Sequence, residues 1–266
     1  MGDRAVYCAR LESVCAERHR GFESPPIRIT QDLRSLSASQ MIAVMRAIFA
    51  FVFLLGAASL LAQKELSASG ELGAARQDYL KGRFDQALGA LDRFDKATGT
   101  TVESLDLRGC IDLEQGKLDD AANAFESAHL LKYDAFAPRI HLADVTLRQK
   151  KFADARRGYE KLLDLIKTPM WPDYLRFGVL LTYLAENDQM GSQRALHAIA
   201  FPTETPAYYY AQAAWAFTHG RKSEGNKWVS IARKIFDASK TAWFDRTLYQ
   251  FGWLTKKPAP SIDPFF

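Results

Sequence analysis

Apolar, small and turn-forming positions recur along the body of the chain with a period near 34 residues. The segment Tyr79-Leu-Lys-Gly82-Arg-Phe84-Asp-Gln-Ala87 returns as Leu113-Glu-Gln-Gly116-Lys-Leu118-Asp-Asp-Ala121, and again as Leu147-Arg-Gln-Lys150-Lys-Phe152-Ala-Asp-Ala155. Two looser copies follow, around Glu186 and Gly220. A fixed period of this length is the signature of a repeat protein in which each copy is one supersecondary unit.

Each copy has the pattern of a helical hairpin. A Leu or an aromatic residue ends the apolar stripe of a first helix, and a Gly or polar residue allows a turn. A small residue near the start of the second helix, such as Ala121, then lets the two helices approach closely. Because one hairpin cannot bury its apolar face alone, we expect the copies to stack on one another.

The copy with Gly109, Leu113, Gly116, Ala121, Phe125 and Ala128 resembles the tetratricopeptide repeat, as does the preceding copy with Gly82, Phe84 and Ala87. The resemblance covers roughly residues 68–235. It departs at Phe94, where a small residue is usual, and at Lys150 and Glu186, which replace the turn glycine. It implies an all-α fold, a right-handed superhelical solenoid of about five helix-turn-helix repeats within residues 63–254.

The last part of the chain predicts an end to the stack. Trp243, Phe244, Leu248 and Phe251 recur at helical spacing, so we expect a capping helix between Thr241 and Leu254 that covers the last repeat. Residues 255–266 contain three prolines, and we expect this tail to be disordered.

An apolar run near the N-terminus predicts export. Residues 47–62 are uncharged, follow Arg46 and end in small residues, which is the pattern of a secretory signal peptide. The run is shorter than the ~20 residues that span a bilayer. We therefore interpret residues 41–62 as a signal peptide, cleaved after Ala58 or Ala62, that directs the protein to the periplasm or the extracellular space. An uncleaved membrane anchor is the alternative.

Residues 1–40 are polar and rich in Arg and Ser, without a clear period. Because a secretion signal is expected near the start of translation, we interpret them as an upstream, disordered extension, with Met41 or Met45 as the start. Cys8, Cys15 and His19 lack a fourth ligand and do not indicate a metal site.

Charge and motifs narrow the function. The formal net charge is +4, and the body after the apolar run is nearly balanced, which gives no electrostatic case for nucleic-acid binding. Neither a phosphate-binding loop nor a dinucleotide, hydrolase or zinc-protease motif is present. We predict no catalytic residue, no cofactor and no metal, and we interpret Cys110 as a packing residue. His129, His141, His197 and His219 are scattered without ligand spacing and are interpreted as helix-surface or turn residues.

The inner face of the first helices is the predicted binding surface. In the fourth and fifth repeats it carries Phe177, Leu180, Leu184 and Tyr210, which we interpret as an apolar groove for a protein or peptide partner. The second and third repeats place polar residues there: Asp106, Cys110, Glu114, His141, Asp144 and Arg148. The alternative is that the C-terminal helix covers the groove. A non-catalytic interaction scaffold is therefore the leading hypothesis, ahead of a structural subunit of an envelope assembly that uses its outer faces and of an unrecognised enzyme.

Overall fold

The computed structural model describes residues 38–166, 171–202 and 204–261. The chain divides into two compact units, residues 1–59 and residues 60–266. The described residues contain helices and turns and no strand. The helices are α1 (Ala38–Leu80), α2 (Phe84–Thr98), α3 (Val102–Glu114), α4 (Leu118–Leu131), α5 (Phe136–Arg148), α6 (Phe152–Leu165), α7 (Trp171–Ala185), α8 (Gln189–His197), α9 (Ala207–Thr218), α10 (Lys222–Ile235) and α11 (Ala238–Gln250).

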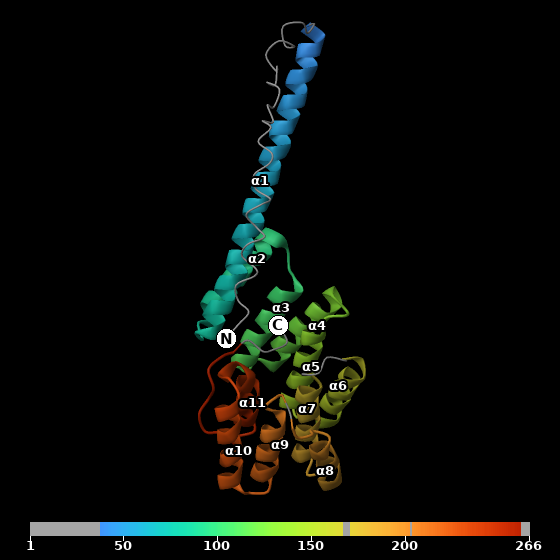
Figure 1. The fold of residues 1–266 in the computed structure, drawn as a ribbon, viewed down its shortest axis with the longest axis vertical. Coiled ribbons are helices and arrows are strands. Elements are labelled where there is room, and N and C mark those ends of the chain that lie inside the picture. Colours follow the sequence, from blue (N-terminus) through green and yellow to red (C-terminus); the bar gives the residue numbers. More distant parts are fainter. Residues whose placement is uncertain (1–37, 167–170, 203, 262–266) are drawn as a thin grey trace, which may run out of the picture. The chain divides into compact units, whose positions relative to one another are not determined.

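In the second unit, helices that follow one another in sequence pack side by side (Figure 1). The pairs α3 with α4, α5 with α6, α7 with α8 and α9 with α10 coincide with the second to fifth predicted repeats, and first helices of neighbouring pairs also touch. For the part of the chain that the structure describes, the prediction of an all-α fold built from adjacent helix pairs is confirmed, and this architecture is consistent with a helical repeat.

The first helices end in the same turn. After α1, α3, α5, α7 and α9, a residue adopts a left-handed backbone conformation: Gly82, Gly116, Lys150, Asn187 and Gly220. At Gly116 the backbone N–H donates to the carbonyl of Leu113 (3.1 Å), and the N–H of Lys117 donates to the carbonyl of Asp112 (2.9 Å). This pair of bonds satisfies carbonyls that the helix end leaves open. Recurrence of the same turn explains why glycine is periodic in the sequence.

The fourth copy corrects the predicted register by one residue. We predicted Glu186 at its turn, but Asn187 takes the positive φ of 56° there. Asn tolerates the left-handed conformation better than Glu, because its short side chain hydrogen-bonds locally. The next residue, Asp188, then begins α8 as its N-cap, with its side chain accepting a bond from the Gly191 N–H (2.8 Å).

Small residues set the distance between the two helices of a pair. Ala121 on α4 is fully buried, and a side chain at Gly109 on α3 would place its Cβ only 2.6 Å from the Phe125 ring. Because core atoms are already close-packed, a larger residue at either position would push the helices apart. The sequence pattern of small residues therefore encodes the pair geometry.

The buried side chains form two clusters. One joins the end of α1 to α4 and includes Tyr79, Leu91, Ile111 and Phe125. The other joins α5 to α11 and is richer in aromatic residues, among them Tyr159, Phe177, Tyr210 and Phe244.

The predicted capping helix is present as α11, which begins and ends a few residues before the predicted bounds. The segment that follows it was predicted to be disordered, and the structure corrects this for residues 255–261. Lys257 Nζ lies 3.4 Å from Glu114 Oε2, and an Arg246 guanidinium nitrogen donates to the Ser261 carbonyl (3.1 Å). These contacts hold the segment against α3 and α11 despite its prolines. Residues 262–266 lie outside the described part of the chain.

The predicted signal segment, residues 41–62, lies within the helix α1, and helical conformation is shared by signal peptides and membrane anchors. Among the described residues, no helix combines the length and hydropathy needed to cross a membrane. The predicted extension falls almost wholly on residues 1–37, outside the described part. Export therefore stays a prediction.

Candidate functional site

The predicted apolar groove is filled by α11. Phe177, Leu180 and Tyr210 are fully buried and Leu184 is 4 % exposed. All four belong to the same buried cluster as Trp243, Phe244 and Leu248 of α11. The prediction that these residues line an open groove for a partner is therefore wrong for this conformation. The alternative, in which the C-terminal helix makes Tyr210 part of the core, describes the structure.

Aromatic stacking holds the middle of α11. The Phe244 ring lies between Tyr174 and Tyr210, with ring centroids 4.7 Å and 4.9 Å away and interplanar angles of 26° and 24°. Phe177 meets the same ring edge-on at 5.1 Å. Stacked and edge-to-face pairs contribute about 0.5–1.5 kcal/mol each beyond their area of burial. The aromatic residues of α7 and α9 thus bind α11 as they were predicted to bind a partner.

A partly buried polar network fixes the orientation of α11 beside these rings. The Tyr210 hydroxyl donates to Asp245 Oδ1, and the Arg233 guanidinium of α10 bonds both oxygens of the same carboxylate, at 2.9 and 3.1 Å. Burial, and then the negative charge of Asp245, raise the pKa of the Tyr210 hydroxyl well above its usual range. Tyr210 therefore acts as a neutral hydrogen-bond donor at physiological pH.

Other side chains of α11 meet polar residues of α3 and α5. Arg246 Nε lies 3.1 Å from Glu114 Oε1, and both side chains are at most 10 % exposed. Asp144 of α5 accepts hydrogen bonds from the Trp243 indole N–H (3.1 Å) and from the Tyr159 hydroxyl (2.6 Å). Burial and Asp144 raise the pKa of Tyr159 as well. The polar residues predicted for the inner face of the second and third repeats thus include the partners of α11.

Three further polar side chains lie together between α3 and α5. Asp106 and Cys110 of α3 and His141 of α5 are 1–3 % exposed, and their potential ligand atoms lie within 4.8 Å of one another. His141 Nδ1 is 2.9 Å from Asp106 Oδ1, and the His141 ring packs against Phe125, with centroids 4.8 Å apart.

This cluster corrects our interpretation of His141 as a helix-surface or turn residue. The sequence placed all three residues on the polar inner face of the second and third repeats, but they lie on different helices and share no short motif, so we did not interpret them as a cluster. Two signals were available: Asp106 and Cys110 are one helical turn apart, and His141 follows about one repeat later. Combining helical spacing with the repeat period predicts such clusters.

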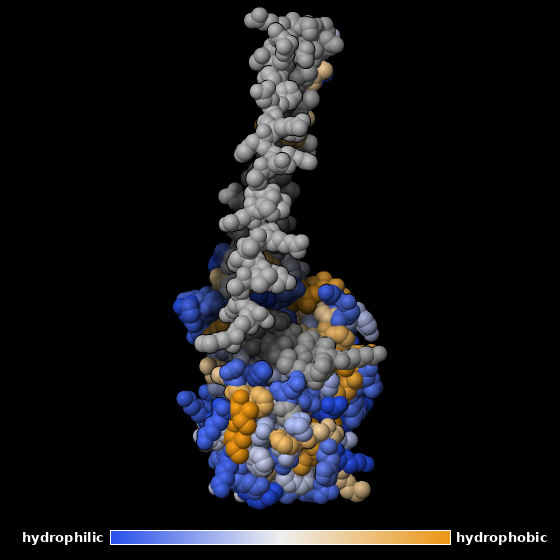
Figure 2. Space-filling view, in the orientation of Figure 1, coloured by the Kyte–Doolittle hydropathy of each residue, from blue (hydrophilic) through white to orange (hydrophobic). Residues whose placement is uncertain are grey.

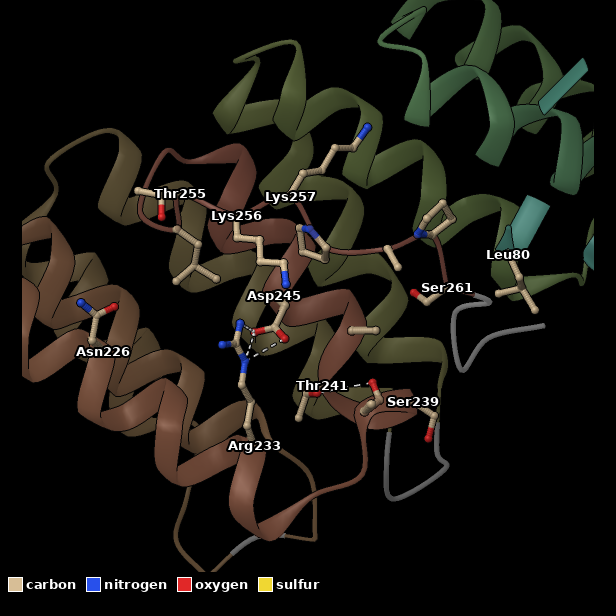
Figure 3. A pocket seen from close by; sticks show the side chains of 16 residues that line it. Leu80, Asn226, Arg233, Ser239, Thr241, Asp245, Thr255, Lys256, Lys257 and Ser261 are labelled. Atoms are coloured by element: carbon tan, nitrogen blue, oxygen red, sulfur yellow. Dashed lines mark hydrogen bonds and ion pairs between the residues drawn. The ribbon is translucent and has the colours of Figure 1, made fainter. Parts of the chain in front are cut away.

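An open pocket of about 1000 Å³ lies between α10, α11 and the segment 254–261. Figure 3 shows Arg233 and Asp245 facing one another on its wall, with the side chain of Lys256 above them. The charges of Arg233 and Asp245 neutralise each other, so this pocket presents a paired arginine and carboxylate to solvent.

Apolar residues reach the surface where the second helices end. Leu131, Leu165 and Ile235 are the last residues of α4, α6 and α10, and each is more than half exposed. Phe201, shortly after α8, is 63 % exposed. These four residues recur at or near the ends of second helices, and we call them the edge ladder. On the face drawn in Figure 2, apolar side chains appear in separate patches among hydrophilic ones.

No family model matches the chain, and no curated protein matches it at a significant level.

Proposed function

We propose that the protein is a non-catalytic helical scaffold of the tetratricopeptide type that binds another protein through the outer edge of its repeats. The observation that carries the proposal is the combination of a filled inner face with an exposed edge ladder. Recurrent left-handed turns, small residues at the helix contacts and sequential pairing of helices support a right-handed superhelical solenoid.

The inner face is not the binding surface in this proposal. To open it, α11 would have to withdraw Phe244 and Leu248, which are fully buried, and Trp243, which is nearly so. Full burial of one large apolar side chain stabilises by about 1.5–3 kcal/mol, so exposing three together would cost much of the stability of a domain. A partner would have to supply that free energy before gaining any affinity.

The edge ladder offers binding free energy without this cost. Large apolar side chains that are already exposed lose only hydration when a partner covers them. Single exposed apolar residues are ordinary on protein surfaces, but here they recur at the same place in several repeats. This use of the outer surface corresponds to our second hypothesis, a structural subunit of an envelope assembly.

The test is crosslinking and capture of partners from cells that express the tagged full chain. The triple variant Leu131→Ser/Leu165→Ser/Ile235→Ser should bind each captured partner about tenfold more weakly or worse, since the loss of even one anchor that contributes about 1–2 kcal/mol weakens binding roughly tenfold. Met190→Ser is the matched control, because Met190 is 72 % exposed and lies outside the ladder. Equal capture by both variants, with unchanged melting temperatures, would contradict the proposed surface.

We also propose that the chain is exported. The support is the apolar run at residues 47–62 after Arg46. N-terminal sequencing of the product made in a bacterial host from the native reading frame should find Ser59 or Gln63 as the first residue. A product that keeps residues 1–40, or one confined to the cytosol, would refute this part.

A further inference from the structure

We propose that Asp106, Cys110 and His141 form a metal-binding site for Zn²⁺ or a similar borderline transition-metal ion. The site would join the first helices of two neighbouring pairs, α3 and α5. It does not depend on the scaffold function proposed above.

The fold places the three ligand atoms together. Asp106 and Cys110 are four residues apart on α3, so they lie on the same face of the helix one turn apart. His141 approaches from α5, a helix that contacts α3 directly. All three potential ligand atoms lie within 4.8 Å of one another.

The distances suit a tetrahedral ion after small side-chain adjustments. Zinc bonds to N, O and S ligands are about 2.0–2.3 Å long, so ligand atoms around a tetrahedral zinc are roughly 3.3–3.8 Å apart. Atoms within 4.8 Å of one another exceed the upper end of that spacing by about 1 Å at most, which is within the reach of side-chain rotation. A ligand set held by two packed helices is thus largely preformed.

The donor types select the kind of metal. A thiolate and an imidazole are ligands that zinc and related transition metals prefer, whereas Ca²⁺ and Mg²⁺ require mostly oxygen ligands. A carboxylate and a neutral imidazole can bind a metal directly, and a thiol that coordinates zinc loses its proton because the metal lowers its pKa. One carboxylate and one thiolate together would balance the charge of a divalent ion.

Asp106 is a carboxylate at a repeat position where the other pairs have a large apolar or aromatic residue. Counted back from each left-handed turn residue, the tenth residue is Asp106, Ile140, Phe177 and Tyr210 in successive pairs. The other three members pack in the apolar core, while Asp106 brings a carboxylate that is 2 % exposed into the same place. A buried carboxylate is costly unless it is paired or coordinates a metal, and here Asp106 is paired with His141 Nδ1, which holds two of the proposed ligands side by side.

A small cavity of about 20 Å³ lies on one side of His141, which lines it together with Asp144, Arg148 and residues of α11. That volume holds one water molecule.

Cobalt spectroscopy of the full chain tests the proposal. The protein would carry Cys8→Ser and Cys15→Ser, so that Cys110 is its one thiol. After chelation and dialysis, titration with Co²⁺ should give a thiolate-to-cobalt charge-transfer band in the near ultraviolet that saturates at one equivalent. Zn²⁺ should displace the cobalt, and elemental analysis should find one zinc per chain.

Ligand variants separate this site from adventitious binding. Cys110→Ala should abolish the band, and His141→Gln and Asp106→Asn should weaken zinc binding about 100-fold or more, since even residues that only orient ligands contribute 10–100-fold. His129→Gln, on α4 and outside the cluster, should change nothing.

The shift in melting temperature on adding zinc is a second readout. It is measured within each protein, so a variant need not be as stable as the parent protein. Zn²⁺ should raise the melting temperature of the parent in proportion to the logarithm of its concentration, and should leave that of Cys110→Ala unchanged. Absence of the cobalt band in the folded parent protein would overturn the proposal. Zinc binding that survives in both Cys110→Ala and His141→Gln would overturn it as well.

Discussion

The two halves of the surface that holds α11 use different chemistry. On α7 and α9, the rings of Tyr174, Phe177 and Tyr210 surround Phe244. On α3 and α5, the carboxylate of Glu114 forms an ion pair with Arg246, and the carboxylate of Asp144 accepts a hydrogen bond from Trp243. One helix is therefore held on α7 and α9 by stacked aromatic rings, with the Tyr210–Asp245–Arg233 network beside them, and on α3 and α5 mainly by buried charges.

The two kinds of contact contribute differently to the stability of the docked α11 and to its orientation. Burial of large aromatic side chains dominates core energetics, because each removes about 150–250 Å² from water. A buried ion pair gains less, since its desolvation offsets most of the attraction, but it heavily penalises arrangements in which one charge has no partner. We infer that the rings supply most of the free energy that keeps α11 in place and that the charges fix its direction across the repeats.

The largest effect is expected where the rings meet. Phe244→Ala should lower the free energy of unfolding by about 3–5 kcal/mol, the usual cost of removing a buried phenylalanine. Chemical denaturation measures the loss. Phe201→Ala is the control, because Phe201 is 63 % exposed, and a surface substitution should stay within about 0.5 kcal/mol. Similar losses for both variants would mean that α11 does not pack on α7 and α9 in solution.

The helix pairs could be predicted from sequence because they depend on local spacing. Gly116, Ala121 and Phe125 carry the turn and the close helix contact within one hairpin, and the period repeats them. The fourth turn was misplaced by one residue, since Asn187 and Glu186 are both polar and only the backbone conformation distinguishes them.

The site was harder to predict because it depends on contacts between distant segments. The aromatic residues Phe177 and Tyr210 indicated an apolar surface correctly, but the same pattern suits a partner protein or the protein's own helix. Trp243 bonds Asp144, 99 residues earlier, and the spacing within either helix does not encode that meeting. Asp106, Cys110 and His141 were placed on the same polar face from sequence, but their direct contact across two helices was not predicted for the same reason.

The polar end should respond less strongly than the aromatic end. Glu114→Gln leaves Arg246, which is 10 % exposed, without its buried charged partner, and should destabilise the fold by about 1–3 kcal/mol. Glu126→Gln, an exposed residue of α4, should have almost no effect.

A double-mutant cycle makes this comparison specific. If the contact is real, Glu114→Gln and Arg246→Met should be less than additive, with a coupling of about 0.5–3 kcal/mol. Full additivity would show that α11 does not reach α3.

The tyrosine hydroxyls at the two ends should differ from ordinary tyrosines in their pH dependence. Tyr210→Phe removes one hydrogen bond to Asp245 and should cost about 0.5–1.5 kcal/mol at neutral pH. The pKa of Tyr210 is raised in the folded protein, so its hydroxyl stays protonated there while the unfolded chain loses its proton near pH 10. This contribution is complete below about pH 10 and is lost as the pH rises toward the folded pKa.

The melting temperature of the parent protein should therefore fall more steeply above pH 10 than that of Tyr210→Phe. Tyr159→Phe, at the Asp144 end, should behave in the same way because burial raises that pKa also. Parallel curves for the parent and both variants between about pH 9 and 11 would contradict the buried hydroxyl bonds.

The smallest effect is expected at Lys257, which shares Glu114 with Arg246 but lies at the surface. Lys257 Nζ is 3.4 Å from Glu114 Oε2, and its side chain is 51 % exposed. Exposed ion pairs contribute about 0.2–1 kcal/mol, so Lys257→Ala should lower the free energy of unfolding by no more than that. Salt distinguishes Lys257 from Arg246. The Debye length falls to roughly 3 Å at 1 M salt, so exposed charge pairs are largely screened, whereas buried pairs are affected much less. Raising the salt from about 0.1 M to 1 M should thus remove the effect of Lys257→Ala and preserve most of the effect of Arg246→Met. If Lys257→Ala costs as much as Arg246→Met and resists salt, then the segment 255–261 holds α11 in place, and charge at this end contributes to stability as the aromatic rings do at the other.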